Sequence, residues 1–129
     1  MTTASTRRPT SSELEILHIL WERGPSTVRD VHQALHQKRP IGYTSVLKLM
    51  QIMTAKGMVL RNEEQRAHVY EAVQPAEKTK RELAMDVLQR VFDGSASELM
   101  MHALSGRKAS KEEIEEMRRL LNEHERKLR

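Results

Sequence analysis

Apolar residues recur at intervals of three and four along much of this chain, the spacing that lines one face of an α-helix. The first such stretch predicts a helix over residues 12–23, and its expected buried residues are Leu14, Leu17, Leu20 and Trp21. A shorter helix is predicted over residues 26–37, with Ser26 as its N-terminal cap. Its expected buried residues are Val28, Val31 and Leu35. Neither helix is long enough to be stable without a common core.

A third predicted helix, between Gly42 and Gly57, has two contrasting faces. Its apolar face consists of Val46, Leu49, Met50 and Met53. Its polar face consists of Thr44, Ser45, Lys48, Gln51 and Lys56. Because no Asp or Glu occurs between Asp30 and Glu63, this part of the chain has only positive charge. Such a surface suits a polyanion.

Two short β-strands are predicted after this helix, over residues 58–61 and 67–72, with a polar connection between them. Two such strands are not stable alone, so they must pack against the helices. A helix, a tight turn, a second helix and a two-stranded wing form the arrangement in which the second helix enters a DNA major groove. The sequence therefore favours a winged helix-turn-helix domain over residues 10–75, after a disordered lead over residues 1–9.

The remaining residues, 76–129, are expected to form helices interrupted at Gly94 and Gly106. Their apolar residues follow helical spacing but are too few to enclose a core within one chain. We therefore expect a helical dimerisation domain and a mainly α-helical fold. The predicted dimer contacts are Leu83, Val87, Val91, Leu99, Ile114, Met117 and Leu121.

Composition restricts the possible functions. The 129 residues include no Cys, which excludes a disulfide framework and thiolate metal sites, and only 3% are aromatic, too few for the stacking surfaces of single-strand binders. The net charge of +4 is concentrated between residues 38 and 68, so double-stranded DNA is the favoured partner. The first residues have no apolar segment, which predicts a cytoplasmic protein without membrane insertion.

No group of residues has the spacing of a catalytic site. The sequence lacks a G-x-S-x-G elbow and a glycine-rich phosphate loop, so we expect no enzymatic activity and no cofactor. His32 and His36 are one helical turn apart, as in helical zinc sites, but Gln33 occupies the position of the catalytic Glu and no third ligand is near. Two surface histidines without a metal are expected.

Four sequence blocks and a tail resemble the penicillinase and methicillin-resistance repressor family in order and spacing. The blocks are S-E-L-E-I-L-H-I-L-W (12–21), G-P-S-T-V-R-D-V (24–31), Y-T-S-V-L through K-G-M-V (43–59) and R-A-H-V-Y (66–70), and the tail is S-K-E-E-I-E-E-M-R-R-L-L (110–121). The resemblance covers residues 10–121. It implies a winged-helix repressor that dimerises through its C-terminal helices and binds a palindromic operator.

The resemblance also implies which residues contact DNA. Tyr43, Thr44 and Ser45 match the start of the family's recognition helix, and Arg66 with Tyr70 matches its wing. Together with the polar face of the third helix, this predicts a set of DNA-binding residues. The set is Tyr43, Thr44, Ser45, Lys48, Gln51, Arg61, Arg66 and His68.

The chain departs from the family pattern at several positions. Family members commonly have a small hydroxyl residue in place of Lys48 and a basic residue in place of Ile52, so a different operator is expected. Antibiotic-responsive members are cleaved at an Asn-Phe bond, and the aligned pair here is His102-Ala103. Cleavage by a different regulatory protease and release by a ligand or partner without cleavage both stay open. The alternative function is a winged-helix module for protein–protein contact with no specific DNA target.

Overall fold

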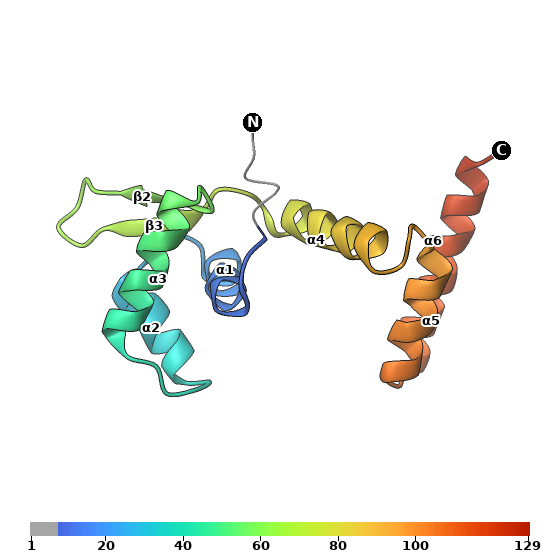
Figure 1. Cartoon of the computed structure of the whole chain (residues 1–129), viewed down its shortest axis with the longest axis horizontal. Coiled ribbons are helices and arrows are strands. Elements are labelled where there is room, and N and C mark those ends of the chain that lie inside the picture. Colours follow the sequence, from blue (N-terminus) through green and yellow to red (C-terminus); the bar gives the residue numbers. More distant parts are fainter. Residues whose placement is uncertain (1–7) are drawn as a thin grey trace. The chain divides into compact units, whose positions relative to one another are not determined.

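The computed structural model describes residues 8–129, so residues 1–7 of the predicted lead lie outside the described part (Figure 1). Helices predominate, with one small antiparallel sheet, which confirms the predicted fold class. The elements are α1 (Ser11–Arg23), β1 (Ser26–Thr27), α2 (Val28–His36), α3 (Tyr43–Ala55), β2 (Val59–Asn62), β3 (Val69–Ala72), α4 (Ala76–Arg90), α5 (Ala96–Gly106) and α6 (Lys111–Lys127).

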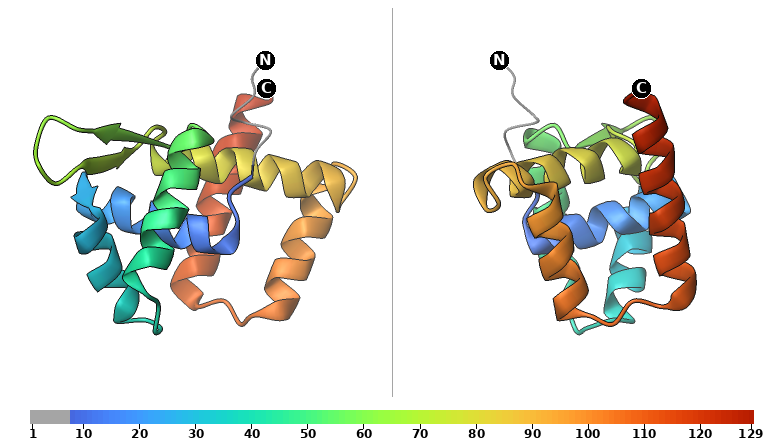
Figure 2. Two further views of the ribbon diagram at one scale, coloured as in Figure 1. Left: turned by 60° about the vertical axis from the view of Figure 1, so that its left-hand side comes forward. Right: turned by 90° about the vertical axis from the view of Figure 1, so that its right-hand side faces the viewer.

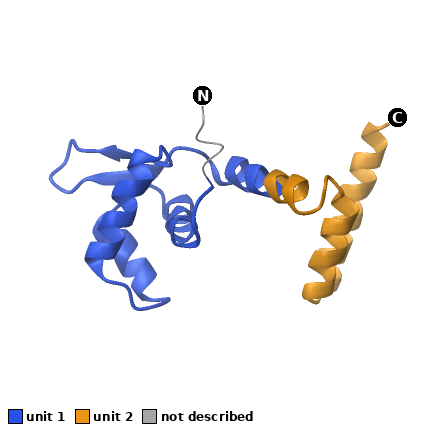
Figure 3. Cartoon of the chain, viewed as in Figure 1, with its two compact units in different colours: residues 1–84 blue, residues 85–129 orange. Residues whose placement is uncertain are grey.

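The chain divides into two compact units, one up to Ala84 and one from Met85 onward (Figure 3). The boundary falls inside α4. The first unit contains α1, α2, α3 and the sheet, and the second contains α5 and α6. Each unit is described separately below.

Helix α1 begins with a capping box. The sequence allows this box at Thr10 with Glu13 or at Ser12 with Glu15, and the structure forms the first: the Glu13 amide donates to Thr10 Oγ1 over 3.2 Å, and the Thr10 amide donates to Glu13 Oε1 over 2.9 Å. Glu15 pairs instead with Arg39, 2.7 Å away. One backbone group at each end of the box is thereby satisfied.

The buried face of α1 differs from the predicted one. Ile16, Leu17, Ile19 and Leu20 are buried, whereas Leu14 and Trp21 are only half-buried. The reason is that α2, α3 and β3 all contact α1, so its buried face is wider than a single three-four stripe. Trp21 lies at the edge because its indole N–H donates to the Gln74 carbonyl over 3.0 Å.

Helix α2 is capped by Thr27, so the prediction that Ser26 caps it is wrong. Thr27 Oγ1 accepts from the Asp30 amide over 3.1 Å, and the Asp30 carboxylate accepts from the Thr27 amide over 3.1 Å. Ser26 is buried in β1, where it pairs with Tyr70 of β3. The two-residue strand was not predicted, because two residues show no periodicity.

Helix α3 has the predicted apolar face: Val46, Met50 and Met53 are fully buried, and Leu49 is half-buried. It ends in a Schellman motif, in which the Met58 amide donates to the Met53 carbonyl over 2.9 Å. Gly57 has a φ of 81°, a conformation that favours glycine, and thereby turns the chain into β2. Because Val46, Met50 and Met53 are buried, they fix the rotation of α3 about its axis.

The sheet has the strand order β1-β3-β2, and both pairings are antiparallel. The predicted hairpin is present as β2 and β3, with every strand limit within two residues of the predicted one. Tyr70 of the central strand faces Arg61 in β2 and Ser26 in β1 and is only 2% exposed. Its ring joins the core that α1, α2 and α3 share. Val59 of β2 is buried in the same core, so both strands attach the wing to the helices.

The second unit has well-capped helices but no interior. Ser95 and Ser110 accept amide hydrogen bonds at the starts of α5 and α6. Ser110 and Glu113 have the spacing of a capping box in the sequence, but only half of it forms at the start of α6, because the Glu113 carboxylate accepts from Arg107 instead. No residue of α5 or α6 is buried, and Figure 2 shows them as two separate rods joined by a short connection. This unit therefore has no core of its own.

Candidate nucleic-acid interface

The solvent-exposed face of α3 contains the polar residues that the sequence predicted for it. Thr44, Ser45, Lys48 and Gln51 are all exposed. The buried residues on the opposite side of the helix fix its orientation, so these polar side chains point into solvent. Ile52 is 38% exposed, so the position at which the chain departs from the family pattern also lies at the surface.

The start of α3 differs from the starts of its neighbours. A side chain caps α1, α2, α5 and α6, whereas Gly42 at the start of α3 offers none. Unpaired amides at a helix N-terminus, together with the helix dipole, favour an anion. Tyr43, Thr44 and Ser45 make up this first turn. The first turn of α3 is therefore suited to a phosphate group.

His32 holds the chain segment that leads into α3. Its Nε2–H donates to the Ile41 carbonyl over 2.9 Å, and its ring meets Tyr43 edge-on with 5.8 Å between ring centroids. The prediction of two surface histidines is wrong for His32, which is half-buried, and right for His36, which is exposed. Within residues 8–129, no three His, Cys, Asp or Glu side chains are placed to bind a metal.

A groove joins the start of α2, the start of α3 and the wing. It is lined by Thr27, Val28, Arg29, Tyr43, Leu47, Arg66, Ala67, His68 and Tyr70. Three predicted DNA-binding residues, Tyr43, Arg66 and His68, meet here, while the others lie along α3 or on β2. Tyr70, which the resemblance matched to the wing, is buried and forms part of the floor.

Arg29 is a groove residue that the sequence reasoning missed. It lies in the first turn of α2, two residues after the cap Thr27, and its side chain is exposed. The signal was present: Thr27 and Asp30 have the spacing of a capping box, which places Arg29 at the start of a helix. The prediction left it out because a place in the first turn does not show that this turn adjoins the wing, which depends on how the folded chain brings α2 and the wing together.

Ion pairs within the chain reduce the positive charge available to a partner. Arg39 pairs with Glu15 at 2.7 Å, Lys56 with Glu13 at 2.8 Å, and Arg61 with Glu63 at 2.6 Å. Lys56 was predicted on the polar face of α3, but its ammonium group contacts α1 instead. No ion pair forms at Arg29, Lys48 or Arg66 within the described range. These three cations remain for an external anion.

Hydrogen bonds hold the carboxyl groups of Glu13 and Asp30 in the ionised form. Burial by itself raises the pKa of Glu13, but hydrogen bonds from Lys56 and Thr10 outweigh it, and the pKa lies below the ordinary value of 4.5. Hydrogen bonds from the Thr27 backbone and side chain likewise lower the pKa of Asp30. Both carboxylates are therefore charged at neutral pH, where Glu13 accepts from Lys56 and Asp30 accepts from the Thr27 amide.

The predicted dimer contacts lie at or near the surface. Val87, Val91, Ile114 and Leu121 are exposed, and Leu83, Leu99 and Met117 are half-buried. Met117 and Leu121 also line a hollow between α5 and α6, together with Met100, Leu120, Glu123, His124 and Lys127. Within the described residues, none of the helices has both the length and the hydropathy needed to span a bilayer.

Three helices around an antiparallel sheet, with an exposed third helix beside a β-hairpin, define a winged-helix domain. The sequence profile of the family described as Penicillinase repressor matches residues 9–123. This chain belongs to that family, which confirms the resemblance predicted from its sequence. The family consists of transcriptional regulators.

Three relatives are similar along most of the chain. The transcriptional regulator BlaI of Mycobacterium tuberculosis is 33% identical over 115 residues, covering 88% of this chain and 82% of the relative. The methicillin resistance regulatory protein MecI of Mammaliicoccus sciuri is 20% identical over 112 residues, which cover 87% of this chain and 91% of the relative. MecI of Staphylococcus aureus matches to the same extent. Both kinds of relative are regulators by name.

Proposed function

We propose that this chain is a transcriptional repressor that binds a palindromic operator in double-stranded DNA as a homodimer. The observation that carries the proposal is the groove in which Tyr43, Arg66 and His68 meet Arg29, next to the exposed polar face of α3. Membership in the penicillinase repressor family supports it. Residues 10–75 would bind DNA, and residues 76–129 would hold two chains together.

The proposed contacts are of two kinds. Thr44, Ser45, Lys48 and Gln51 lie on the face of α3 that can enter a major groove, where hydroxyl, amide and ammonium groups reach base edges. Arg61, Arg66 and His68 lie on the wing and would contact the phosphate backbone, which positions the protein without specifying sequence. Tyr43, next to the uncapped start of α3, would contact backbone as well.

Selection of bound duplexes from a random pool tests the proposal directly. We expect one enriched palindrome, with half-sites separated by about one helical turn of DNA, ~34 Å, or a multiple of it. Affinity for that duplex should fall with salt at a slope of about −0.9 per phosphate neutralised. A pool without enrichment, together with an affinity that does not depend on salt, would instead favour a protein–protein interaction module.

The proposed dimer rests on apolar surface in the second unit. Val91 is 65% exposed and Leu121 is 55% exposed. Exposed apolar residues spaced along helices without a core are expected to be covered by another chain. We expect sedimentation to show a dimer for the native chain, a monomer for Leu121→Glu and a dimer for the control Asn122→Glu. A native monomer with full operator affinity would contradict the homodimer.

A further inference from the structure

We propose that Glu13 is a positioning residue for DNA recognition: through Lys56, its buried carboxylate fixes the last turn of α3 and thereby the angle at which α3 meets the operator. The proposal rests on the DNA-binding function proposed above. Glu13 lies in α1 and is buried, so it would act without touching DNA.

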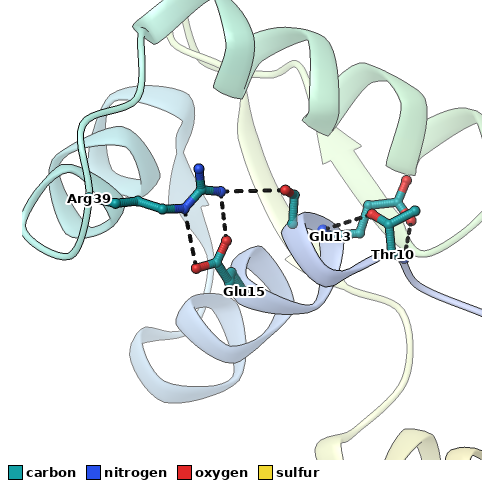
Figure 4. A network of polar contacts seen from close by, with 5 residues as sticks. Thr10, Glu13, Glu15 and Arg39 are labelled. Atoms are coloured by element: carbon teal, nitrogen blue, oxygen red, sulfur yellow. Dashed lines mark hydrogen bonds and ion pairs between the residues drawn. The ribbon is translucent and has the colours of Figure 1, made fainter.

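The Glu13 carboxylate has a different partner for each oxygen. Oε1 accepts from the Thr10 amide over 2.9 Å, and Oε2 accepts from Lys56 Nζ over 2.8 Å. Figure 4 shows the first of these contacts at the start of α1. The residue is only 1% exposed. One buried carboxylate therefore joins the beginning of α1 to the end of the recognition helix, 43 residues later in the chain.

Both charges lie at the helix ends where they are favourable. Glu13 is in the first turn of α1, and Lys56 is the C-terminal cap residue of α3. Negative charge near a helix N-terminus and positive charge near a C-terminus each interact favourably with the helix dipole. The Lys56 amide also donates to the Ile52 carbonyl over 2.9 Å, so the backbone and side chain of Lys56 both fix the last turn.

The position of α3 is sensitive to this contact because the carboxylate is buried. A tilt that moved Lys56 away would leave a charged group without its counterion in the interior, which is strongly unfavourable. The Arg39–Glu15 pair, also drawn in Figure 4, makes a useful comparison. Its side chains are 42% and 33% exposed, so water can replace the partner and the pair constrains little.

Two variants separate positioning from a direct role of Lys56 in DNA binding. Glu13→Gln keeps an acceptor for the capping box, since Gln serves at that position, but removes the charge that holds Lys56. Lys56→Met removes the cation and keeps most of the side chain length. Glu15→Gln is the matched control, because it removes the exposed pair from the same helix.

We expect both variants to weaken operator binding about tenfold, which corresponds to about 1.4 kcal/mol of binding free energy. This loss lies at the low end of what the loss of one base contact costs. Binding to an unrelated duplex and the salt slope should stay unchanged, because no phosphate contact is lost. The double variant should be no weaker than the weaker single variant, since both changes break one contact. Measurements are made well below the unfolding temperature of each variant.

Opposite effects would overturn the proposal. If Lys56 instead binds a phosphate, Glu13→Gln frees it and strengthens all duplexes, while Lys56→Met weakens all of them and lowers the salt slope by about 0.9. Folded variants with lower thermal stability but native operator affinity would show a stabilising pair only, which also overturns it.

Failure of the proposed function gives a different result, because the native chain would then bind no specific duplex. In that case, amide hydrogen exchange over residues 55–57 tests the contact itself. We expect faster exchange there in Glu13→Gln than in Glu15→Gln. Equal protection of these amides in the two variants would overturn the positioning role.

Discussion

Replacing Arg66 with alanine removes a cation from the wing that has no ion pair within the described residues. If Arg66 neutralises one DNA phosphate, its loss lowers the salt slope of log affinity by about 0.9. That change corresponds to about an eightfold loss of affinity at 0.1 M monovalent salt and about a fourfold loss at 0.2 M. The loss should be the same for the operator and for unrelated duplexes, because phosphates carry no sequence information.

Arg61 on the same wing serves as the internal comparison. Its guanidinium is 2.6 Å from the Glu63 carboxylate, and both side chains remain partly exposed. Part of its charge is thus already compensated, so Arg61→Ala should lower the salt slope by less than Arg66→Ala does. Glu63→Gln should raise the affinity for all duplexes, since it returns that charge to the wing.

The assay is a fluorescence anisotropy titration of each variant at several salt concentrations, with the operator and a scrambled duplex. Lys48→Ala completes the series, and we expect it to cost about 1–3 kcal/mol on the operator alone. An Arg66→Ala variant with a native salt slope would refute the assignment of Arg66 to a phosphate. Equal losses of discrimination in Lys48→Ala and Arg66→Ala would refute the separation of base and backbone contacts.

Three further predictions concern stability and release. Thr27→Ala removes the cap of α2 and should lower the free energy of unfolding by about 1 kcal/mol in thermal denaturation. The pKa of Glu13 is lower in the folded chain than in the unfolded chain, so the unfolded state binds more protons as pH falls. The contribution of Glu13 to stability should therefore be complete at pH values well above 4.5 and should be lost as pH falls from 4.5 through the lowered pKa, so the loss of stability in acid should be smaller in Glu13→Gln. A protease site inserted between His102 and Ala103, within α5, should reduce operator affinity by about 10²–10⁴ once cut, because each half-site then binds alone. A cut chain with native affinity would contradict this last prediction.

The main elements of the fold were predictable because their apolar spacing is regular. The face of α3 is an example: Val46, Met50 and Met53 repeat at helical intervals, and all three are buried. Irregular features were not predictable. The strand β1 is two residues long, and the full burial of Ile16 in α1 depends on neighbours that only the folded chain brings together.

The candidate site was predictable in its residues but not in its charges. Sequence spacing places Lys48 and Lys56 on the polar face of one helix. In the described range, Lys56 forms an ion pair with Glu13, whereas Lys48 forms none. The pairing of Lys56 with Glu13 joins residues 43 apart in the chain, and local spacing contains no information about such contacts. The groove at Arg29 similarly depends on how α2 meets the wing.

If α5 and α6, which have no buried residues, form the proposed dimer interface, the stability of the second unit depends on protein concentration. In the proposed homodimer, these helices gain an interior only when two chains meet, so their stability follows mass action. The amount of dimer then changes with the square of the monomer concentration. Dilution of the protein during growth, or a modest increase in its degradation, would empty the operator more steeply than in direct proportion, without any inducing ligand.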